Sequence, residues 1–299
     1  MQLHLVDATY ELFRAYYAPR PPVRGRDGVN LSGVSGLIEQ LLYLVREEGA
    51  THLGCATDHV IESFRNDLFA GYKSSAGMPP ELLAQFPIAE DAIRALGMVV
   101  WPMVEFEADD AIGAACERFA DDPRITQVLV CTPDKDMAQL VRDSRVVLLD
   151  RRRRIVYDES AVMAKWGVMP ASIPDWLALV GDSSDGFPGL PGWGAKSAAA
   201  VLMRYGTLED IPARSSAWDV KSLRGAPVLA ATLREHWDEA QLYRSLARLR
   251  TSADGVAIPQ QDVEELRWSG VPRQAWQVFC DEWGLESLRS RPHRWLAEA

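Results

Sequence analysis

The sequence of 299 residues lacks several features that mark particular classes of protein. It has no run of about 18 apolar residues, which excludes an ordinary transmembrane helix. Its first residues lack the basic stretch and long apolar segment of a signal peptide, so we expect a cytoplasmic protein without a membrane partner. Its four cysteines lie far apart with no C-x-x-C pair, so the sequence indicates neither a zinc site nor a disulfide framework.

The sequence also lacks an excess of positive charge. Lysine and arginine number 32 against 42 acidic residues, which gives a net charge of −10. Taken alone, this balance argues against a nucleic-acid partner. The charge of a whole protein does not fix the charge of one surface, however, and cations bound to carboxylates reverse the local field. The positions of the acidic residues therefore matter more than their number.

Apolar periodicity predicts an α/β protein. In the first half, short apolar segments alternate with segments of helical spacing, which is typical of a parallel, doubly wound sheet flanked by helices. Beyond about residue 160 the strand signals fade, and helical patterns dominate. We expect an α/β domain over residues 1–165 and a helical domain over residues 166–299. The predicted strands are 2–7, 52–57, 98–101, 127–131, 146–149 and 155–157. The predicted helices are 32–48, 80–96, 108–119, 175–180, 195–205, 228–249 and 273–283.

Three carboxylates directly follow predicted strands. Asp7, Asp58 and Asp134 each come after a strongly apolar segment, where an unpaired carboxylate is costly. In open α/β sheets the functional site lies outside the carboxyl ends of the strands. We therefore expect these three side chains to converge although they are far apart in the sequence.

Further acidic residues stand in pairs near predicted helix starts. Glu107 and Asp110 are three residues apart, as are Asp182 and Asp185, and Asp136 follows Asp134 by two. Each pair alone is adequately explained as a charged first turn that complements the helix dipole. Together the acids would repel one another without cations. Oxygen-rich sites suit Mg²⁺ or Mn²⁺, and two such ions about 3.5–4 Å apart are a known arrangement for phosphoryl displacement.

A glycine-rich segment follows the last acidic pair. In Gly189–Ala198, Gly192 and Gly194 precede a helical pattern that contains Lys196. Backbone N–H groups at such a helix start bind phosphate without reading sequence, although a purely structural helix–helix turn is the simpler explanation of the glycines alone. The basic run Arg151–Arg154 indicates a solvated turn first and a phosphate contact second.

The ordered motifs resemble the 5′ nuclease (flap endonuclease) superfamily, and in particular the 5′→3′ exonuclease domain attached to bacterial DNA polymerase I. The resemblance covers essentially the whole chain, and no polymerase domain follows in this sequence, so we expect a free-standing relative. The motifs that carry it are Leu5-Val6-Asp7, Thr57-Asp58, Phe64-Arg65 through Gly71-Tyr72-Lys73, Phe106-Glu107-Ala108-Asp109-Asp110, Thr132-Pro133-Asp134-Lys135-Asp136, Gly181-Asp182-Ser183-Ser184-Asp185, Gly189–Ala198 and Glu282–Leu288.

The resemblance implies a PIN-like α/β core with two Mg²⁺ or Mn²⁺ ions in one active site. The resemblance places around the first ion Asp7, Asp58, Glu107 and Asp109, directly or through water. It places around the second ion Asp134, Asp136 and Asp185. Two further acids, Asp110 and Asp182, would support these ligands. The resemblance also implies a helical arch near residues 61–83, in which Lys73 reaches the scissile phosphate. A helix–three-turn–helix element at about residues 179–202 would hold duplex DNA, with K⁺ at its turn.

By the same resemblance, the expected substrate is branched, flapped or 5′-ended DNA, cleaved by a monomer to give 5′-phosphate and 3′-hydroxyl ends. The expected DNA contacts are Arg14, Arg65, Lys73, Gly192, Gly194 and Lys196. The sequence departs from the family pattern at three places. Ala76 replaces the usual arginine after the arch lysine, Gly186 replaces the usual asparagine, and Thr57-Asp58-His59 replaces the usual Phe-Asp-Ala.

Three other functions remain open at this point. The first is a catalytically weak or inactive DNA junction-binding protein of the same fold, which Ala76 favours and the retained acids oppose. The second is a small PIN-type ribonuclease, but such proteins are usually about half as long and lack the glycine-rich hairpin. The third is a phosphatase, which Asp134-Lys135-Asp136 alone would suggest.

Overall fold

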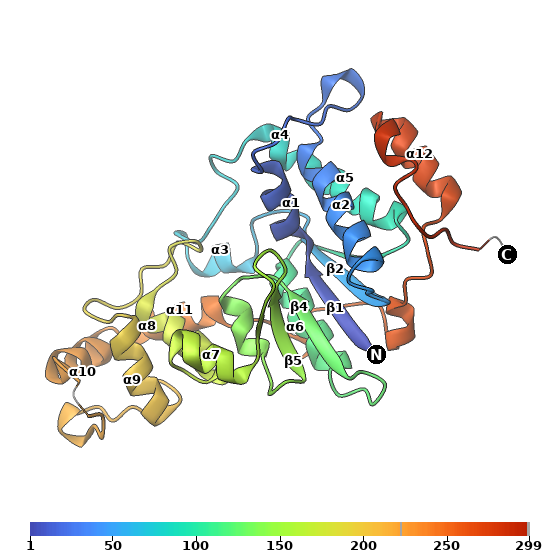
Figure 1. The fold of residues 1–299 in the computed structure, drawn as a ribbon. Helices are drawn as coiled ribbons and strands as arrows, with labels where there is room; N and C mark the ends of the chain where they lie inside the picture. The colour runs from blue at the N-terminus through green and yellow to red at the C-terminus, as the bar shows by residue number, and fades with distance from the viewer. Residues whose placement is uncertain (222, 298–299) are drawn as a thin grey trace. The chain divides into compact units, whose positions relative to one another are not determined.

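The computed structural model describes residues 1–221 and 223–297, and the chain divides into two units (Figure 1). The first unit comprises residues 1–61, 75–132 and 250–299, and the second comprises 62–74 and 133–249. The chain crosses between the units repeatedly. The sequential division that we predicted, at residues 165 and 166, stays a prediction. That boundary lies inside the second unit.

The first unit is built on four parallel strands in the order β3-β2-β1-β4. Strand β1 places Asp7 opposite Ala56 of β2, and β2 places Asp58 opposite Met103 of β3. Strands β1 and β2 are almost entirely buried, as expected for central strands of a parallel sheet covered on both faces. The predicted α/β class with a largely parallel sheet is confirmed. The strands are β1 (Gln2–Asp7), β2 (His52–Asp58), β3 (Val99–Met103) and β4 (Gln127–Cys131).

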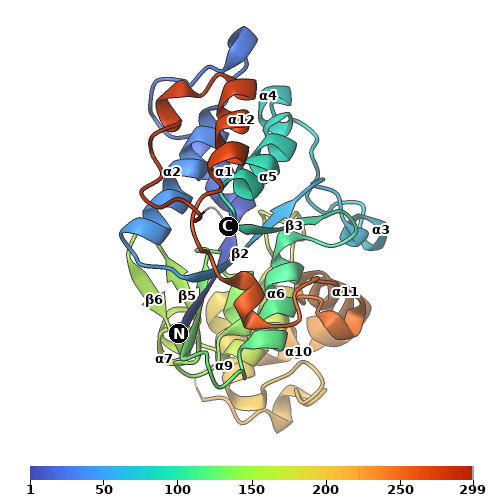
Figure 2. The ribbon, with the colours of Figure 1, turned by 90° about the vertical axis from the view of Figure 1, so that its right-hand side faces the viewer.

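Helices cover this sheet on both sides (Figure 2). Helix α6 contacts β1, β2 and β3. Helix α2 packs against α1 and α5, of which α1 contacts β2 and α5 contacts both β2 and β3. Each helix buries an apolar face; in α2, for example, Leu37, Ile38 and Leu41 are completely buried. The helices of this unit are α1 (Ala8–Tyr16), α2 (Ser32–Arg46), α4 (Pro80–Leu83), α5 (Gln85–Ala95), α6 (Ala108–Phe119) and α12 (Arg273–Trp283).

The last fifty residues of the chain return to the first unit. Helix α12 packs on α5, and the backbone N–H of Trp268 donates to the carbonyl oxygen of Thr51 at 2.8 Å. The indole of Trp268 is buried and donates to the carbonyl oxygen of Leu96 at 2.9 Å. These contacts join the last segment of the chain to the first unit.

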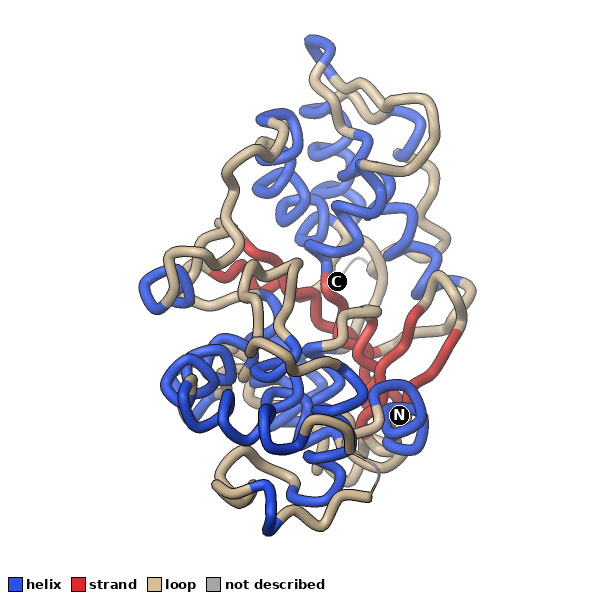
Figure 3. Tube along the Cα trace, turned by 90° about the vertical axis from the view of Figure 1, so that its left-hand side faces the viewer, coloured by secondary structure: helices blue, strands red, loops and turns tan. Residues whose placement is uncertain are grey.

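The second unit is mainly helical (Figure 3). Its two strands, β5 (Val146–Asp150) and β6 (Ile155–Tyr157), pair antiparallel, and α8 packs against both α9 and α11. The single helix predicted over 228–249 is two helices, because the backbone leaves helical geometry at His236, with φ −108° and ψ 34°. The helices are α3 (Phe64–Leu68), α7 (Glu159–Trp166), α8 (Ile173–Val180), α9 (Ala195–Tyr205), α10 (Ala226–Glu235) and α11 (Trp237–Ala247).

The segment predicted as a helical arch, residues 61–83, is helical only at its two ends. Helix α3 ends at Leu68 and α4 begins at Pro80, and residues 69–79 between them form turns and bends. Gly71, Gly77 and Pro79 account for this interruption, since glycine and proline both oppose a continuous helix. Across the residues that the structure describes, no helix is both long and apolar enough to cross a membrane.

Candidate active site

Asp7 ends strand β1 and begins helix α1. Its Oδ1 accepts the backbone N–H of Tyr10 at 2.8 Å, so the carboxylate caps the helix. Its Oδ2 accepts the hydroxyl of Thr132, the residue after β4, at 3.0 Å. The side chain is only 7% exposed. Two hydrogen bonds therefore fix the Asp7 carboxylate at the carboxyl end of the sheet, where the sequence placed it.

Asp58 and Glu107 meet at the start of helix α6. Oδ1 of Asp58 accepts the backbone N–H of Ala108 at 2.8 Å, and the N–H of Asp58 donates to Thr9 at 2.8 Å. Glu107 is the N-cap residue of α6, and Asp109 lies half-buried in its first turn. The carboxyl end of β2 and the start of α6 thus bring three predicted ligands of the first unit to one region.

Asp110 has a different environment from its neighbours. It is completely buried, and its two oxygens accept the backbone N–H groups of Glu107 at 2.9 Å and Arg250 at 2.8 Å. The first hydrogen bond fixes the backbone at the start of α6, and the second fixes the backbone at Arg250, where the last segment of the first unit begins. The geometry favours the supporting role that the family resemblance implied.

Three carboxylates of the second unit form a compact trio. Oxygens of Asp136, Asp182 and Asp185 lie within 4.8 Å of one another, a spacing that one cation can bridge. Asp182 is therefore closer to this centre than its predicted supporting role suggested. Asp134, a predicted ligand, is exposed and stands outside the trio; its Oδ1 accepts the backbone N–H of Asp136 at 3.0 Å.

Asp136 is the member of the trio that most needs a cation. It is 6% exposed, and its buried Oδ1 has no hydrogen-bond partner among the described residues. Burial, followed by repulsion from Asp134 and Asp185, raises the pKa of Asp136 well above its usual range. A divalent cation would supply both the missing contact and the missing charge, so the donor set fits a hard metal ion.

Lys135 partly neutralises the trio, a contact that the sequence analysis did not predict. Its ammonium group forms an ion pair with Oδ2 of Asp182. Burial lowers the pKa of Lys135, but the hydrogen bond to Asp182 and the neighbouring acids outweigh it, and the net shift is upward. Lys135 is therefore charged at neutral pH and acts as a built-in counter-ion. The only sequence signal was its place between Asp134 and Asp136.

Lys73 lies beside the trio and not on an open surface. Its Nζ is 3.5 Å from Oδ1 of Asp185, and the Tyr72 hydroxyl donates to Oδ2 of the same carboxylate at 3.3 Å. The Lys73 N–H also donates to the carbonyl oxygen of Asp185 at 3.0 Å.

Gly186, the residue after Asp185, has φ +88°, and an added Cβ would lie 2.2 Å from the carbonyl oxygen of Gly71. Glycine is thus required here, which explains this departure from the family pattern.

Two predicted DNA contacts have partners within the protein. Arg65 is 2% exposed, and its guanidinium donates to the carbonyl oxygens of Leu246 at 2.8 Å and Arg248 at 3.2 Å. The buried guanidinium thus holds α3 within the second unit, and its role in DNA binding stays a prediction. Arg14 forms an ion pair with the buried Glu11 and keeps part of its side chain exposed.

The glycine-rich turn opens into a groove of about 920 Å³. Gly192, at φ +78°, Gly194 and Lys196, which the sequence predicts as DNA contacts, line it from the turn and the start of α9. Lys221 and Arg224, which the sequence analysis did not single out, line it from the segment before α10. Trp193 also lines the groove, and its buried Nε1 has no acceptor in the described part of the chain. All these groups favour an anionic ligand.

Comparison with known proteins agrees with this arrangement. The family model described as the N-terminal resolvase-like domain of 5′-3′ exonucleases matches residues 2–167, and the one described as their C-terminal SAM fold matches residues 168–273. The chain belongs to the 5′-3′ exonuclease family. Both halves of the fold, the parallel sheet and the helical region, thus correspond to known parts of this family.

Two curated members of the 5′-3′ exonuclease family show the extent of the match. DNA polymerase I of Mycobacterium leprae is 36% identical over 99% of this chain, which spans only 32% of that protein. The 5′-3′ exonuclease of Bacillus subtilis is 37% identical over 70% of this chain and 72% of its own length. The chain therefore corresponds to part of the polymerase and to most of the exonuclease.

Solved structures of other proteins have the same fold. The T5 5′-exonuclease with bound divalent metal ions (zinc) has a TM-score of 0.64, with 16% identity over 94% of this chain and 98% of the other. Flap endonuclease-1 from Methanococcus jannaschii has a TM-score of 0.58, with 13% identity over 97% and 90% of the two chains. At such low identity the likeness concerns the fold alone.

Proposed function

We propose that the chain is a structure-specific 5′ nuclease that hydrolyses DNA phosphodiester bonds and leaves 5′-phosphate and 3′-hydroxyl ends. The observation that carries this proposal is the trio Asp136, Asp182 and Asp185, with one buried oxygen that lacks a partner. The relatives support it, since they include a protein named 5′-3′ exonuclease and a T5 exonuclease described with divalent metal ions.

The proposed cofactor is Mg²⁺ or Mn²⁺. In the second unit the trio would hold one ion, and in the first unit Asp7, Asp58, Glu107 and Asp109 would hold another, directly or through water. The donors are all carboxylates, which Mg²⁺ and Mn²⁺ prefer over the nitrogen and sulfur ligands typical of zinc. When bound, such ions lower the pKa of the attacking water and stabilise the leaving oxygen.

The protein's own groups would prepare the phosphate for this reaction. Lys73, 3.5 Å from Asp185, is well placed to pair with a non-bridging oxygen of a phosphate near that carboxylate. A cation held there helps most where negative charge develops in the transition state. Tyr72 keeps the Asp185 carboxylate oriented through its hydroxyl. A bound ion would neutralise the Asp182 carboxylate, and Lys135 would then lose its ion pair with Asp182.

The groove at the start of α9 is the proposed grip on duplex DNA. Its cations are Lys196, Lys221 and Arg224, and backbone N–H groups at the helix start add further phosphate donors. These groups contact the backbone and not the base edges, so binding would depend on DNA structure and weakly on its sequence. The family resemblance adds K⁺ bound by carbonyl oxygens of the turn around Gly192.

The substrates would be flapped, branched or 5′-ended DNA, since solved relatives include the catalytic core of Rad2 in complex with DNA substrate. We propose a monomer that acts in the cytoplasm. A second candidate function, a junction-binding protein with little or no turnover, has one specific observation in its favour: Ala76 is exposed and uncharged where the family commonly has arginine.

One experiment separates these functions. A 5′-labelled flap, a nicked duplex and a single strand of the same sequence are incubated with the protein, with and without Mn²⁺. The 5′ nuclease should cleave the flap or the nicked duplex only with the metal, and the Asp185→Ala variant should bind but not cleave. Tight binding of the flap without metal-dependent cleavage by the wild type would instead identify a junction-binding protein.

A further inference from the structure

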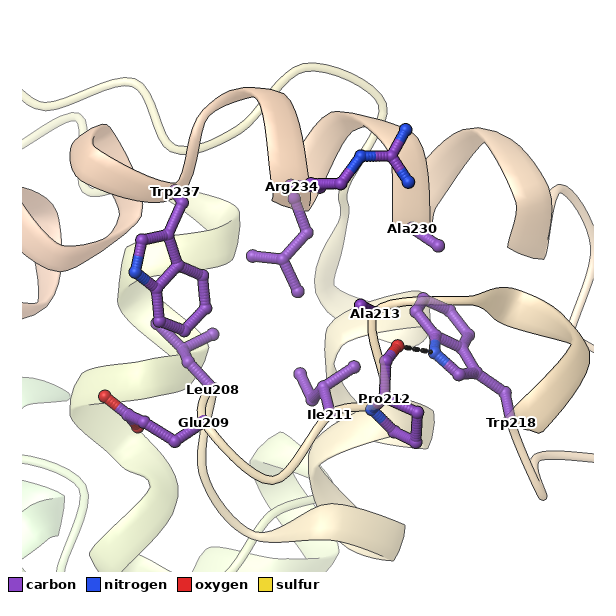
Figure 4. Close-up of a pocket in the computed structure, with 10 residues that line it drawn as sticks. Leu208, Glu209, Ile211, Pro212, Ala213, Trp218, Ala230, Arg234 and Trp237 are labelled. Atoms are coloured by element: carbon purple, nitrogen blue, oxygen red, sulfur yellow. Dashed lines mark hydrogen bonds between the residues drawn. The ribbon is translucent and has the colours of Figure 1, made fainter.

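The second unit contains an apolar pocket whose lining residues belong neither to the acidic trio nor to the lining of the DNA groove. It encloses about 400 Å³ between the loop that follows α9 and helices α10 and α11 (Figure 4). Trp237 and Trp218 stand on opposite sides, with Leu208 and Ile211 between them (Figure 4). We call this cavity the tryptophan pocket. None of its groups has a part in the proposed nuclease reaction.

Buried apolar side chains and a hydrogen-bonded indole line the pocket. Leu208 is completely buried, and Ile211 and Leu233 are 7% and 5% exposed. The indole N–H of Trp218 donates to the carbonyl oxygen of Pro212 at 2.6 Å, which holds that ring in place. Cavities of this size suit a small ligand or a single large side chain. An apolar lining of this kind favours an apolar occupant over water.

The charged groups at the edge of the pocket are not equivalent. Glu209 is engaged by Arg244, whose two nitrogens each lie 2.6 Å from a Glu209 oxygen. The hydrogen bonds from Arg244 lower the pKa of Glu209 to about 2. Arg234, in contrast, is exposed and has no hydrogen bond or ion pair within the described residues. The charge that remains available at the edge is therefore one guanidinium.

The surroundings also limit the kind of occupant. Asp210, Glu235 and Asp238, next in sequence to lining residues, are all exposed. This acidic surface disfavours a polyanion such as nucleic acid, whose binding needs several cations. One guanidinium beside an apolar cavity fits a single carboxylate attached to an apolar group. The last residue of a polypeptide has this chemistry, because its terminal carboxylate lies directly beside its side chain.

We propose that the tryptophan pocket binds the C-terminus of a partner protein that ends in a large apolar residue. The terminal side chain fills the cavity between Trp218 and Trp237, and the terminal carboxylate pairs with Arg234. The guanidinium geometry suits a carboxylate, which it can engage through two parallel hydrogen bonds. This contact would attach a partner to the second unit at a surface separate from the groups that bind and cleave DNA.

The test uses a fluorescein-labelled octapeptide of glycine and serine that ends in phenylalanine with a free carboxylate. Binding to the full chain is measured by fluorescence anisotropy. Three further peptides serve as comparisons: the C-terminal amide, the version ending in alanine, and the same composition with phenylalanine moved to the centre. Each is measured against the wild type, Arg234→Glu and the matched control Arg214→Glu, at an exposed arginine outside the pocket.

The free-acid phenylalanine peptide should bind, and amidation, removal of the phenyl group and Arg234→Glu should each weaken binding about tenfold or more, which corresponds to about 1.4 kcal/mol. Arg214→Glu should bind like the wild type, and Arg234→Glu should cleave a DNA flap at the wild-type rate. Equal affinity for the acid and the amide, no saturable binding, or equal behaviour of the two arginine variants would overturn the proposal. Loss of single-stranded DNA binding in Arg234→Glu alone would identify nucleic acid as the occupant and overturn it as well.

Discussion

Gly186 offers a sharp test of the geometry around the acidic trio. The change is Gly186→Ala, and the matched control is Gly206→Ala in the same unit. The two glycines have similar positive φ angles, +88° and +83°. An added Cβ at Gly186 would lie 2.2 Å from the carbonyl oxygen of Gly71, whereas at Gly206 nothing lies within 4 Å. Comparing the two variants therefore separates the effect of backbone strain on stability from the effect of the close contact with Gly71.

The expected magnitudes follow from this difference. A positive φ strains alanine by roughly 1–3 kcal/mol, so both variants carry a cost of this kind. In Gly186→Ala the backbone at Gly71–Lys73 must also move away, which weakens the hydrogen bonds from Lys73 N–H and the Tyr72 hydroxyl to Asp185. Each bond contributes about 1 kcal/mol. Gly186→Ala should thus lose roughly 1–2 kcal/mol more than the control, and its Tm should fall by roughly 2–8 °C more.

Thermal unfolding in the presence of chelator measures the stability, and single-turnover cleavage of a flap measures the consequence for Lys73. Gly186→Ala should cleave more slowly than Gly206→Ala at a temperature where both are folded, because Lys73 is displaced from Asp185. Equal losses of stability and equal cleavage rates in the two variants would refute the close approach of residues 71 and 186.

Three further predictions concern single groups. Lys73→Ala should lower the single-turnover rate about a hundredfold, or about 2.7 kcal/mol, with little change in duplex affinity; equal losses in both would make Lys73 a simple binding residue. Asp136→Asn should stabilise the metal-free protein increasingly as pH rises above about 4, because burial raises the folded pKa of Asp136 and its ionisation then costs stability. Unfolding in chelator across pH measures this, and a pH-independent difference would contradict it. Lys221→Ala and Arg224→Ala should each lower the salt slope of duplex binding by roughly 0.9, whereas unchanged slopes would remove them from the groove contacts.

One further measurement and one control variant accompany these tests. Asp136→Asn should also abolish the rise in Tm that Mg²⁺ or Mn²⁺ gives the wild type, since a bound ion stabilises the folded state by mass action. Arg214→Ala, an exposed charge change in the same unit, should leave the salt slope of duplex binding unchanged.

The strand ends could be predicted because one physical rule governs them. Asp7 and Asp58 follow apolar strands, and neighbouring parallel strands end at the same edge of a sheet, so their side chains lie where the pattern indicated. The predicted helices over 108–119, 195–205 and 273–283 match the structure for the same reason: their apolar positions recur at helical spacing.

Other features depended on tertiary contacts that no local pattern contains. Helix α1 was not predicted, because Asp7 seemed only to end a strand, whereas its carboxylate also caps the following helix. Arg65 looked like a surface cation, but distant carbonyl oxygens at Leu246 and Arg248 bury it. The pairing of Lys135 with Asp182 joins residues 47 positions apart. Such pairings follow from the fold and not from neighbouring residues.

The central claim is that carboxylates hold divalent ions that drive cleavage of DNA. The most direct measurement is the single-turnover rate on a 5′-labelled flap, with Mg²⁺ or Mn²⁺ and with excess chelator, for the wild type, Asp136→Asn and Asp185→Ala. The account predicts cleavage by the wild type with metal only, and no cleavage by either variant although both still bind the flap. Wild-type cleavage that persists in excess chelator, or near wild-type rates in the variants, would contradict it.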